Sequence, residues 1–244
     1  MIILSRAYKK DRPTRELIVQ SSMRLFLEQG YSETSCARIA QELGISPGNL
    51  TFYFPTKEHL LSELVEEFCV FQGILMSRNL EEDSGILFYC MELAIMAGLC
   101  EQSLIARDFY ISAYTHPRSL ELIRKKDSER AEILFGKYCP EFTSQDFVIT
   151  ENIVSGIEYG MLISAANAVP FLWDQLSRSL ESVLKLYRVP EEIRYNNIKK
   201  AMDSDYREIG TTFLEKFMRH VEKTNAAAVS KALGEKNSSA WQNQ

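Results

Sequence analysis

Apolar residues recur every three or four positions along almost the whole chain, and this spacing is typical of amphipathic helices. Runs of alternating β-branched residues bounded by hairpin turns are nearly absent. The pattern therefore predicts an all-α protein. The helices are expected at about 13–29, 36–43, 47–53, 56–79, 86–100, 102–115, 118–138, 144–168, 171–187 and 191–223. Short links between long helices favour a compact antiparallel bundle.

The helical spacing is interrupted at residues 43–48 and resumes directly after them. The interruption reads Leu-Gly-Ile-Ser-Pro-Gly, which is a cluster of helix breakers. Gly44 suits the positive φ that ends a helix, Ser46 is a good N-cap, and Pro47 suits the first position of the next helix. This is the spacing of a helix-turn-helix, whose second helix enters the major groove of DNA in DNA-binding proteins.

The helices on both sides of this turn carry apolar residues that form one shared face. These residues are Ile39, Ala40, Leu43, Ile45, Leu50 and Tyr53. Short helix-turn-helix shapes also occur in all-α proteins that never bind nucleic acid. From the turn alone, two interpretations remain: a DNA-binding element, or a packing unit in a helical carrier or interaction module.

Flanking residues extend the motif well beyond the turn. A first helix begins at Pro13 and Thr14 and stops at Gly30, and Tyr53-Phe54-Pro55-Thr56 leads into a long helix. Residues 14–68 closely resemble the DNA-binding domain of the TetR family of bacterial transcriptional regulators. They read TRELIVQSSMRLFLEQGYSETSCARIAQELGISPGNLTFYFPTKEHLLSELVEEF. The resemblance stops at Phe68.

This resemblance implies a three-helix DNA-binding domain followed by a larger helical bundle that binds a ligand and dimerises. We expect the arm and DNA-binding domain at 1–55, the ligand-binding and dimerisation domain at 56–225, and a frayed tail at 226–244. Members of the family are typically homodimers that leave their operator when a small molecule binds. The expected function is a ligand-responsive repressor, with a palindromic operator in double-stranded DNA and an unknown effector as partners.

The candidate DNA contacts lie on and around the second helix of the motif. Asn49 is the best base reader, because its amide both donates to and accepts from an adenine edge. Thr51 suits a thymine methyl, and the ring of Phe52 departs from the polar aromatic that is more usual in the family. The full set is Thr34, Ser35, Arg38, Ser46, Pro47, Gly48, Asn49, Thr51, Phe52, Tyr53 and Lys57.

Several of these residues are assigned to phosphate rather than to bases. Tyr53 and Lys57 match positions that commonly approach phosphates in the family. Thr34, Ser35, Arg38 and Ser46 are further phosphate partners, and Thr34 or Ser35 also serves as the N-cap of the helix at 36–43. For Tyr53, a core position with a satisfied hydroxyl is an equal alternative.

Charge is distributed unevenly along the chain. The formal net charge is −5, yet residues 1–59 hold eight Lys/Arg and six Asp/Glu, so this part carries +2 and the remainder −7. Four of the eight cations, Arg6, Lys9, Lys10 and Arg12, lie in an N-terminal arm. A slightly basic head on an acidic body favours a polyanionic partner that touches only the head. The arm either reaches a neighbouring groove or is disordered.

Dimerisation is expected because one monomer reads too few base pairs to specify a single site in a genome. Small residues recur every fourth position in an apolar helix and would let another backbone approach closely. They are Gly156, Gly160, Ser164 and Ala168. Together with helix 191–223, this stripe is predicted to form an intersubunit four-helix bundle. The alternative is close packing inside one subunit.

The body is rich in aromatic and sulfur side chains, which suit a pocket for an apolar or aromatic molecule and suit an ordinary core equally well. The ligand candidates are Phe88, Met91, Phe109, Tyr110, Tyr114, Tyr159 and Trp173. Four acids on mostly apolar helices either meet a cationic ligand or point to water. They are Glu92, Glu101, Asp108 and Glu158. No ligand class follows from these residues alone.

Motifs for catalysis, cofactors and metals are missing. The chain lacks the nucleophile elbow, phosphate-loop, zinc-protease and dinucleotide-binding patterns, so we expect no enzyme and no cofactor. Its three histidines show no metal-ligand spacing. The five cysteines are unpaired in sequence and suit a reducing compartment. A regulator switched by oxidation of Cys36 or Cys139 remains an alternative.

The expected compartment is the cytoplasm, with no membrane partner. The N-terminal Ile2-Ile3-Leu4 is too short for a signal-peptide core. The most apolar run, 153–173, contains Glu158, Asn167 and Pro170, which are unfavourable at the centre of a bilayer.

Overall fold

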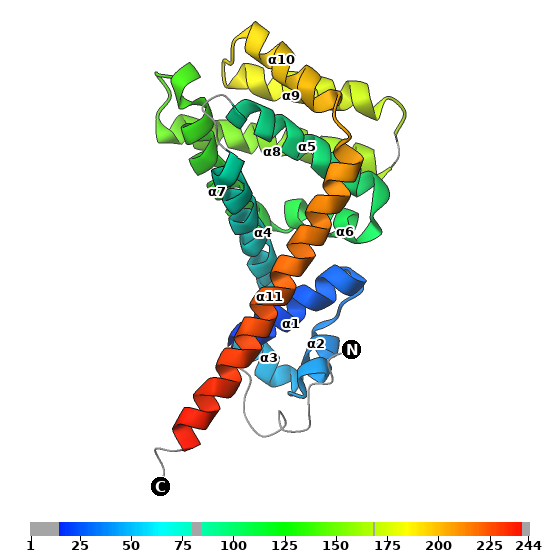
Figure 1. Cartoon of the computed structure of the whole chain (residues 1–244), viewed down its shortest axis with the longest axis vertical. Helices are drawn as coiled ribbons and strands as arrows, with labels where there is room; N and C mark the ends of the chain where they lie inside the picture. Colours follow the sequence, from blue (N-terminus) through cyan, green and yellow to red (C-terminus); the bar gives the residue numbers. More distant parts are fainter. Residues whose placement is uncertain (1–14, 80–83, 168, 241–244) are drawn as a thin grey trace.

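The computed structural model describes residues 15–79, 84–167 and 169–240, and this part of the chain contains no strand. The all-α prediction is therefore confirmed (Figure 1). The elements are α1 (Arg15–Gln29), α2 (Cys36–Leu43), α3 (Pro47–Tyr53), α4 (Lys57–Asn79), α5 (Ser84–Gln102), α6 (Leu104–Thr115), α7 (Pro117–Phe135), the 3₁₀ turn η2 (Gly136–Tyr138), α8 (Ser144–Ala166), α9 (Leu172–Leu186), α10 (Glu191–Met202) and α11 (Tyr206–Ala240).

The segment predicted as one helix at 191–223 is two helices, so this prediction is wrong. The Ser204 hydroxyl donates to the Ala201 carbonyl at 2.6 Å and closes α10, while Asp205 accepts from the Glu208 N–H at 3.1 Å and opens α11. Short polar side chains compete with the helix for its own backbone groups in this way. Helix α11 then continues to Ala240, beyond the predicted end. Fraying of the tail stays a prediction.

The first three described helices form a small head whose buried residues belong to the same hydrophobic core as those of the body. Ile18, Phe26, Ile39 and Leu50 are almost completely buried in it. Gly30 ends α1 with a φ of 93°, which only glycine adopts without strain, and so turns the chain toward α2. The head is thus a packed unit that fixes the position of α3.

Helices α4 to α10, with the first part of α11, form the larger body. Helix α5 lies at its centre and packs against α6, α8, α9, α10 and α11 (Figure 1). By length and composition, Gly85–Gln102 of α5 is also apolar enough to cross a membrane, but 56% of that window is buried inside the protein. Its apolar character is that of a helix surrounded by other helices.

Two long helices join the head to the body. Helix α4 leaves the head after α3 and packs on α1 and α7. Helix α11 comes from the top of the body and lies along α1, so the last helix covers the first (Figure 1). Val221 of α11 is buried there, and the Thr224 hydroxyl donates to the Gln20 side chain at 3.2 Å. A displacement of either helix in the body therefore reaches the head.

Candidate DNA interface and ligand cavity

The turn between α2 and α3 forms as the sequence indicates. Gly44 has a φ of 66°, and the following residue, Ile45, donates its N–H to the Ala40 carbonyl at 3.0 Å. The Ser46 hydroxyl accepts the Asn49 N–H at 3.2 Å, and Pro47 occupies the start of α3. The helix-breaking residues therefore cap the end of α2 and the start of α3, and these bonds fix the angle between the two helices.

Helix α3 presents most of its surface to solvent. Pro47, Gly48 and Thr51 are exposed, and Phe52 is 78% exposed, which is rare for a large apolar ring. Asn49 is half-buried, while Ser46, Ser35 and Arg38 are exposed beside the helix. Tyr53 is half-buried and its ring meets that of Phe52 edge-on, with centroids 5.3 Å apart. Only Leu50 of this helix is fully inside.

Thr34 does not fit the phosphate-binding role predicted for it. Its side chain is fully buried, with 0% exposure, and its hydroxyl donates to the Gly30 carbonyl at 2.7 Å. Ser35 is the N-cap of α2, because its hydroxyl accepts the Arg38 N–H at 3.1 Å. Thr34 therefore holds the turn after α1 instead of facing DNA, and its inclusion among the DNA contacts is corrected.

Lys57 is engaged by the head itself. Its ammonium donates to the Tyr31 carbonyl at 2.9 Å and lies 4.1 Å from the centre of the Tyr31 ring. This combined hydrogen bond and cation–π contact holds the start of α4 against the turn between α1 and α2. A phosphate contact by Lys57 stays a prediction, and it would share the ammonium with Tyr31.

The described part of the head has little free positive charge. Arg15 pairs with Glu63, and Arg24 pairs with Glu28 and Glu42. Residues 15–59 contain four Lys/Arg and five Asp/Glu, so the net positive charge of the head comes from the arm at 1–12. That arm lies outside the described residues.

Asp108 of α6 links the body directly to the head. Its carboxylate accepts the Ser32 backbone N–H at 2.7 Å and also the Ser32 hydroxyl. A Cβ on Gly30 would lie 3.0 Å from the same carboxylate, so the close approach requires glycine there. Nearby, His116 lies 3.2 Å from Glu58 and packs edge-on against the Tyr31 ring.

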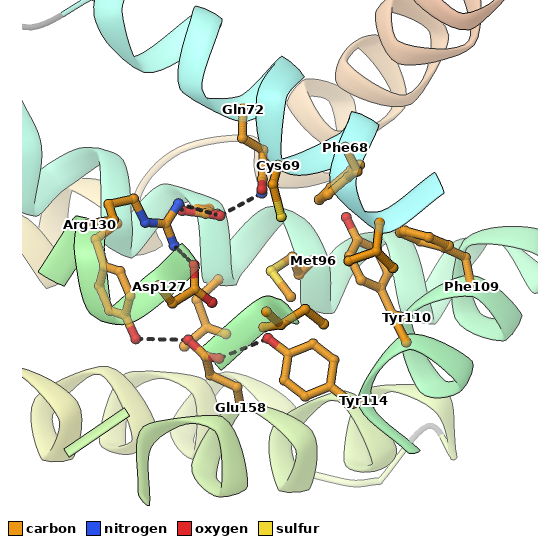
Figure 2. Close-up of a pocket in the computed structure, with 16 residues that line it drawn as sticks. Phe68, Cys69, Gln72, Met96, Phe109, Tyr110, Tyr114, Asp127, Arg130 and Glu158 are labelled. Carbon is orange, nitrogen blue, oxygen red and sulfur yellow. Dashed lines mark hydrogen bonds and ion pairs between the residues drawn. The ribbon is translucent and has the colours of Figure 1, made fainter. Parts of the chain in front are cut away.

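A narrow cavity lies inside the body between α4, α5, α6, α7 and α8 (Figure 2). Its volume is about 40 Å³, enough for one or two waters in the state described. Aromatic walls come from Phe68, Phe109, Tyr110 and Tyr114, and the polar wall opposite them includes Arg130. This combination of apolar rings with a few polar groups is typical of ligand sites.

A larger groove of about 480 Å³ adjoins this cavity, between α5 and α11. Phe88, Met91 and Phe213 supply apolar surface on its sides. Four residues line both spaces and so form the wall between them: Gln72, Glu92, Met96 and Tyr110. The groove alone has the size of a small-molecule site.

The polar wall of the cavity is built around Arg130. Its guanidinium donates to both Glu92 oxygens, at 3.0 and 2.8 Å, and lies 3.0 Å from Asp127. The Gln72 amide donates to Glu92 at 2.5 Å. Figure 2 shows Arg130, Asp127 and Gln72 converging from α7 and α4. Burial raises the pKa of Asp127 to about 6, although Arg130 opposes this shift.

Glu158 lies on the opposite side of the same cavity. Only 6% of this residue is exposed, and its carboxyl accepts the Tyr89 hydroxyl at 3.0 Å and the Tyr114 hydroxyl at 2.8 Å. Burial raises the pKa of Glu158 well above its ordinary value, and the nearby carboxylate of Asp127 adds to this shift. Glu151 lies two turns before Glu158 on α8 and accepts the Tyr187 hydroxyl. Burial raises the pKa of Glu151 to about 7.

Five of the seven ligand candidates line one of the two spaces. Phe88 and Met91 line the groove, while Phe109, Tyr110 and Tyr114 line the cavity. The prediction is corrected for the other two. Tyr159 lines neither space, and Trp173 packs edge-on against Tyr206 with centroids 4.3 Å apart.

Two of the four acids considered for a cation reach the cavity, namely Glu92 and Glu158. Glu101 instead pairs with Arg207 at 2.7 Å, and Asp108 bonds Ser32 as described above. Sequence reasoning missed Arg130 and Asp127 entirely. They lie on α7, a strongly polar helix, where most charges face water, and nothing in the sequence marks these two as inward-facing.

The small-residue stripe of α8 faces outward. Gly156 and Gly160 are exposed, and a Cβ on either would meet no atom within 4 Å. The Ser164 hydroxyl donates to the Gly160 carbonyl at 2.9 Å and accepts from Gln175 of α9 at 2.8 Å. Ala168 lies outside the described residues. Within its own chain α8 packs against α5, α6, α7 and α9. The intersubunit four-helix bundle of α8 with the segment 191–223 stays a prediction.

The thiols and possible metal ligands give no second site. Cys139 is buried and donates to the Tyr187 carbonyl at 3.0 Å, and burial raises the pKa of its thiol, so it is a poor redox sensor. Cys36 is half-buried on α2, and its oxidation stays untested. Within the described ranges, no group of three or more His, Cys, Asp or Glu is placed to hold a metal.

Comparisons of sequence give a consistent result. Residues 18–64 match the family model described as bacterial regulatory proteins, tetR family. The chain is 40% identical over 96 residues to the uncharacterized HTH-type transcriptional regulator YuxN of Bacillus subtilis (strain 168), covering 38% of this chain and 32% of that protein. It is 28% identical over 168 residues to the fatty acid metabolism regulator protein of the same organism, covering 67% and 80%. The match to YuxN thus spans about a third of that protein.

Comparisons of structure agree on the fold. The crystal structure of RolR in complex with the ligand resorcinol superposes with a TM-score of 0.60 at 20% identity, covering 75% of this chain and 92% of that one. SmeT, the repressor of the Stenotrophomonas maltophilia multidrug efflux pump SmeDEF, gives 0.51 at 15% identity, covering 76% and 94%. At these identities the likeness concerns the fold alone.

Proposed function

Because this chain is a transcriptional regulator of the TetR family, we propose that it is a cytoplasmic homodimeric repressor that a small molecule releases from a palindromic operator. The observation that carries the proposal is the exposed face of α3, held outward by the Gly44–Pro47 turn. Pro47, Gly48 and Thr51 are exposed on this face together with the ring of Phe52, so α3 is open to a partner surface.

At the operator, α3 reads the major groove. Asn49 contacts an adenine edge, Thr51 meets a thymine methyl, and Phe52 packs on an apolar part of the groove. Ser35, Arg38 and Ser46 are exposed around α3 and contact phosphates. Tyr53 at the end of α3 and Lys57 at the start of α4 support them. The basic arm adds sequence-independent attraction.

A second copy of the chain binds at the outer face of α8 and α9. Ile149 and Ile153 are half-exposed on the same helix as the open Gly156 and Gly160, and Phe171 before α9 is strongly exposed. Two such faces related by a two-fold axis bury these side chains and place two α3 helices for a palindrome. Because the glycines leave open space, a long side chain there blocks association without disturbing the monomer.

The dimer is tested by Gly160→Arg, read out by light scattering after size exclusion. The variant is expected to be monomeric at micromolar concentration and to lose operator affinity. Gly73→Arg is the matched control, since Gly73 is also an exposed helical glycine with no atom within 4 Å of an added Cβ. A dimeric Gly160→Arg protein would rule out this interface.

Ligand release acts through the helices that contact both the ligand spaces and the head. Phe68, Cys69 and Gln72 of α4 line the cavity, and the other end of α4 begins directly after α3. Phe109 and Tyr110 follow Asp108, which holds Ser32 in the head. A ligand that binds one packing of these helices more tightly shifts the equilibrium toward the packing in which the two α3 helices lie further apart. The size of this shift is set by the difference between the ligand's affinities for the two packings.

The experiment is selection of duplexes from a random pool by the purified full-length protein, followed by titration of the selected operator. Binding is expected to weaken steeply with salt and to fall about fivefold or more for Asn49→Ala, since a base contact contributes about 1–3 kcal/mol. Asn196→Ala, an exposed asparagine on α10, is the control. Transcription in vitro then gives the sign of control. Enrichment of no duplex, or equal binding by Asn49→Ala, would refute the proposal.

A further inference from the structure

The cavity in the body contains more acids than bases. Of the residues that line it, Glu92, Asp127 and Glu158 are acidic, and Arg130 is basic. Asp127 and Arg130 each keep about a fifth of their side-chain surface exposed (20%), and both line this cavity. The lining therefore carries an excess of negative charge whenever all of its acids are ionised.

Arg130 already forms ion pairs with two of these acids. It binds Glu92 through both carboxylate oxygens and also pairs with Asp127. A bidentate pair of this kind leaves the guanidinium little capacity for a third anion. An anionic ligand would have to displace Glu92 or Asp127, and the displaced carboxylate would remain buried without a partner.

Glu158, in contrast, has no cation as a hydrogen-bond or ion-pair partner among the described residues. Its two bonds come from the neutral phenols of Tyr89 and Tyr114. The other titratable or charged groups around it come from every neighbouring element. They are Cys69 on α4, Glu92 on α5, Asp127 and Arg130 on α7, Glu151 on α8, and Tyr187 after α9. Burial opposes a charge on Glu158 most strongly, and the carboxylates of Asp127, Glu151 and Glu92 oppose it as well.

The remaining walls suit a positive charge and an apolar body. Rings of Phe68, Phe109 and Tyr110 face the cavity from α4 and α6 (Figure 2), and aromatic faces attract cations. Tyr110 is only 4% exposed, yet its hydroxyl forms no hydrogen bond with the described chain, and in Figure 2 it points toward the Cys69 side of the cavity. Among the described residues, only the Ser21 hydroxyl is fully buried without a hydrogen bond, so the Tyr110 hydroxyl keeps accessible surface and can bond a molecule in the cavity.

We propose that the effector is an organic cation whose positive group lies beside Glu158 and whose apolar body extends into the groove between α5 and α11. This inference rests on the proposed function and adds the ligand class to it. The present cavity of about 40 Å³ is too small for such a group, but Met96 stands between the cavity and the groove of about 480 Å³. A flexible methionine that moves aside joins the two spaces.

Binding then releases a proton. In the unliganded protein burial and the neighbouring carboxylates raise the pKa of Glu158, which favours its protonated form. A cation beside it favours the carboxylate, so the carboxyl proton passes to solvent as the ion pair forms. The affinity for a ligand of fixed charge therefore rises with pH, by at most about tenfold per pH unit for one proton.

The test is calorimetric titration of the full-length protein without DNA, using three probes that share a phenylbutyl body. They are trimethyl(4-phenylbutyl)ammonium, whose charge is independent of pH, the neutral 4-phenylbutan-1-ol, and the anionic 4-phenylbutane-1-sulfonate. The ammonium ion is expected to bind at least ten times more tightly than the other two. Titrations in two buffers of different ionisation enthalpy should show net release of protons on binding of the ammonium ion.

Glu158→Gln is expected to lose both the preference for the ammonium ion and the proton release. Glu151→Gln, a buried carboxyl outside the cavity lining, is the matched control and should keep the preference. Equal or tighter binding of the alcohol or the sulfonate, heat from none of the probes, or no proton release by the wild-type protein would overturn the inference. Selection of an operator by the same preparation is scored separately. Failure of the cation inference therefore leaves the DNA proposal intact, and failure to select an operator leaves the cation inference intact.

Discussion

Replacement of Asp108 by alanine tests whether the contact between α6 and the head stabilises the head. The substitution removes the acceptor of the Ser32 N–H at 2.7 Å and of the Ser32 hydroxyl. Hydrogen bonds to a charged group contribute about 1.5–3 kcal/mol when buried. Ser32 is exposed, so competition with water reduces each to roughly 0.5–1 kcal/mol. We expect the head to be destabilised by about 1–2 kcal/mol.

Hydrogen exchange followed by mass spectrometry measures this destabilisation locally. A change of about 1–2 kcal/mol corresponds to roughly 5–30-fold faster exchange of the amides at 30–35, and to a fall in Tm of about 2–8 °C for a chain of this size. Asp203→Asn is the control, since Asp203 pairs only with Lys199 on the surface. If exchange at 30–35 is equal in Asp108→Ala and wild type, the contact does not hold the head, and the proposed transmission through α6 fails.

Three further predictions concern the turn, the arm and the buried acids. Gly44→Val is expected to destabilise the head by about 1–2 kcal/mol, because its φ of 66° is strained for a branched residue, and circular dichroism during urea unfolding measures this. Deletion of residues 1–12 should reduce the slope of log affinity against log salt by up to about 0.9 for each phosphate that the arm neutralises, while Asn49→Ala should leave that slope unchanged. Glu151 titrates near 4.5 when unfolded and, because of burial, near 7 when folded, so its stabilising contribution disappears as pH rises from about 4.5 to about 7. As pH rises from 5 to 8, the free energy of unfolding of Glu151→Gln should therefore increase by up to about 3 kcal/mol relative to that of the wild type, as measured by thermal unfolding. Parallel pH profiles of stability for the two proteins would contradict this.

The elements that depend on local signals were predictable from the sequence. The bounds of α2 and α3 match the prediction, because Ser35, Gly44, Ser46 and Pro47 act through bonds to residues at most four positions away. Helices with regular apolar spacing were also found within a few residues. The long segment after Pro190 was missed as two helices, although the run Asp-Ser-Asp at 203–205 carries the capping side chains that divide it.

The ligand cavity could be predicted only in part, because its walls come from five helices that are far apart in sequence. Aromatic residues on apolar helices were sound candidates, since such helices face inward. Arg130 and Asp127 could not be identified from the sequence, because their inward direction depends on how α7 packs on α4 and α8. Thr34 shows the opposite error, since a small hydroxyl residue suits a phosphate contact and an internal turn equally well.

The path of α11 has a consequence for biosynthesis. Thr224 of α11 donates to Gln20 of α1, so a helix made early in translation is covered by one made much later. During translation the nascent head exposes the apolar surface that α11 later covers, and it cannot reach its final packing before α11 is made. Pausing or truncation of translation before α11 would therefore yield chains in which α1, α2 and α3 are complete in sequence yet unfinished in shape.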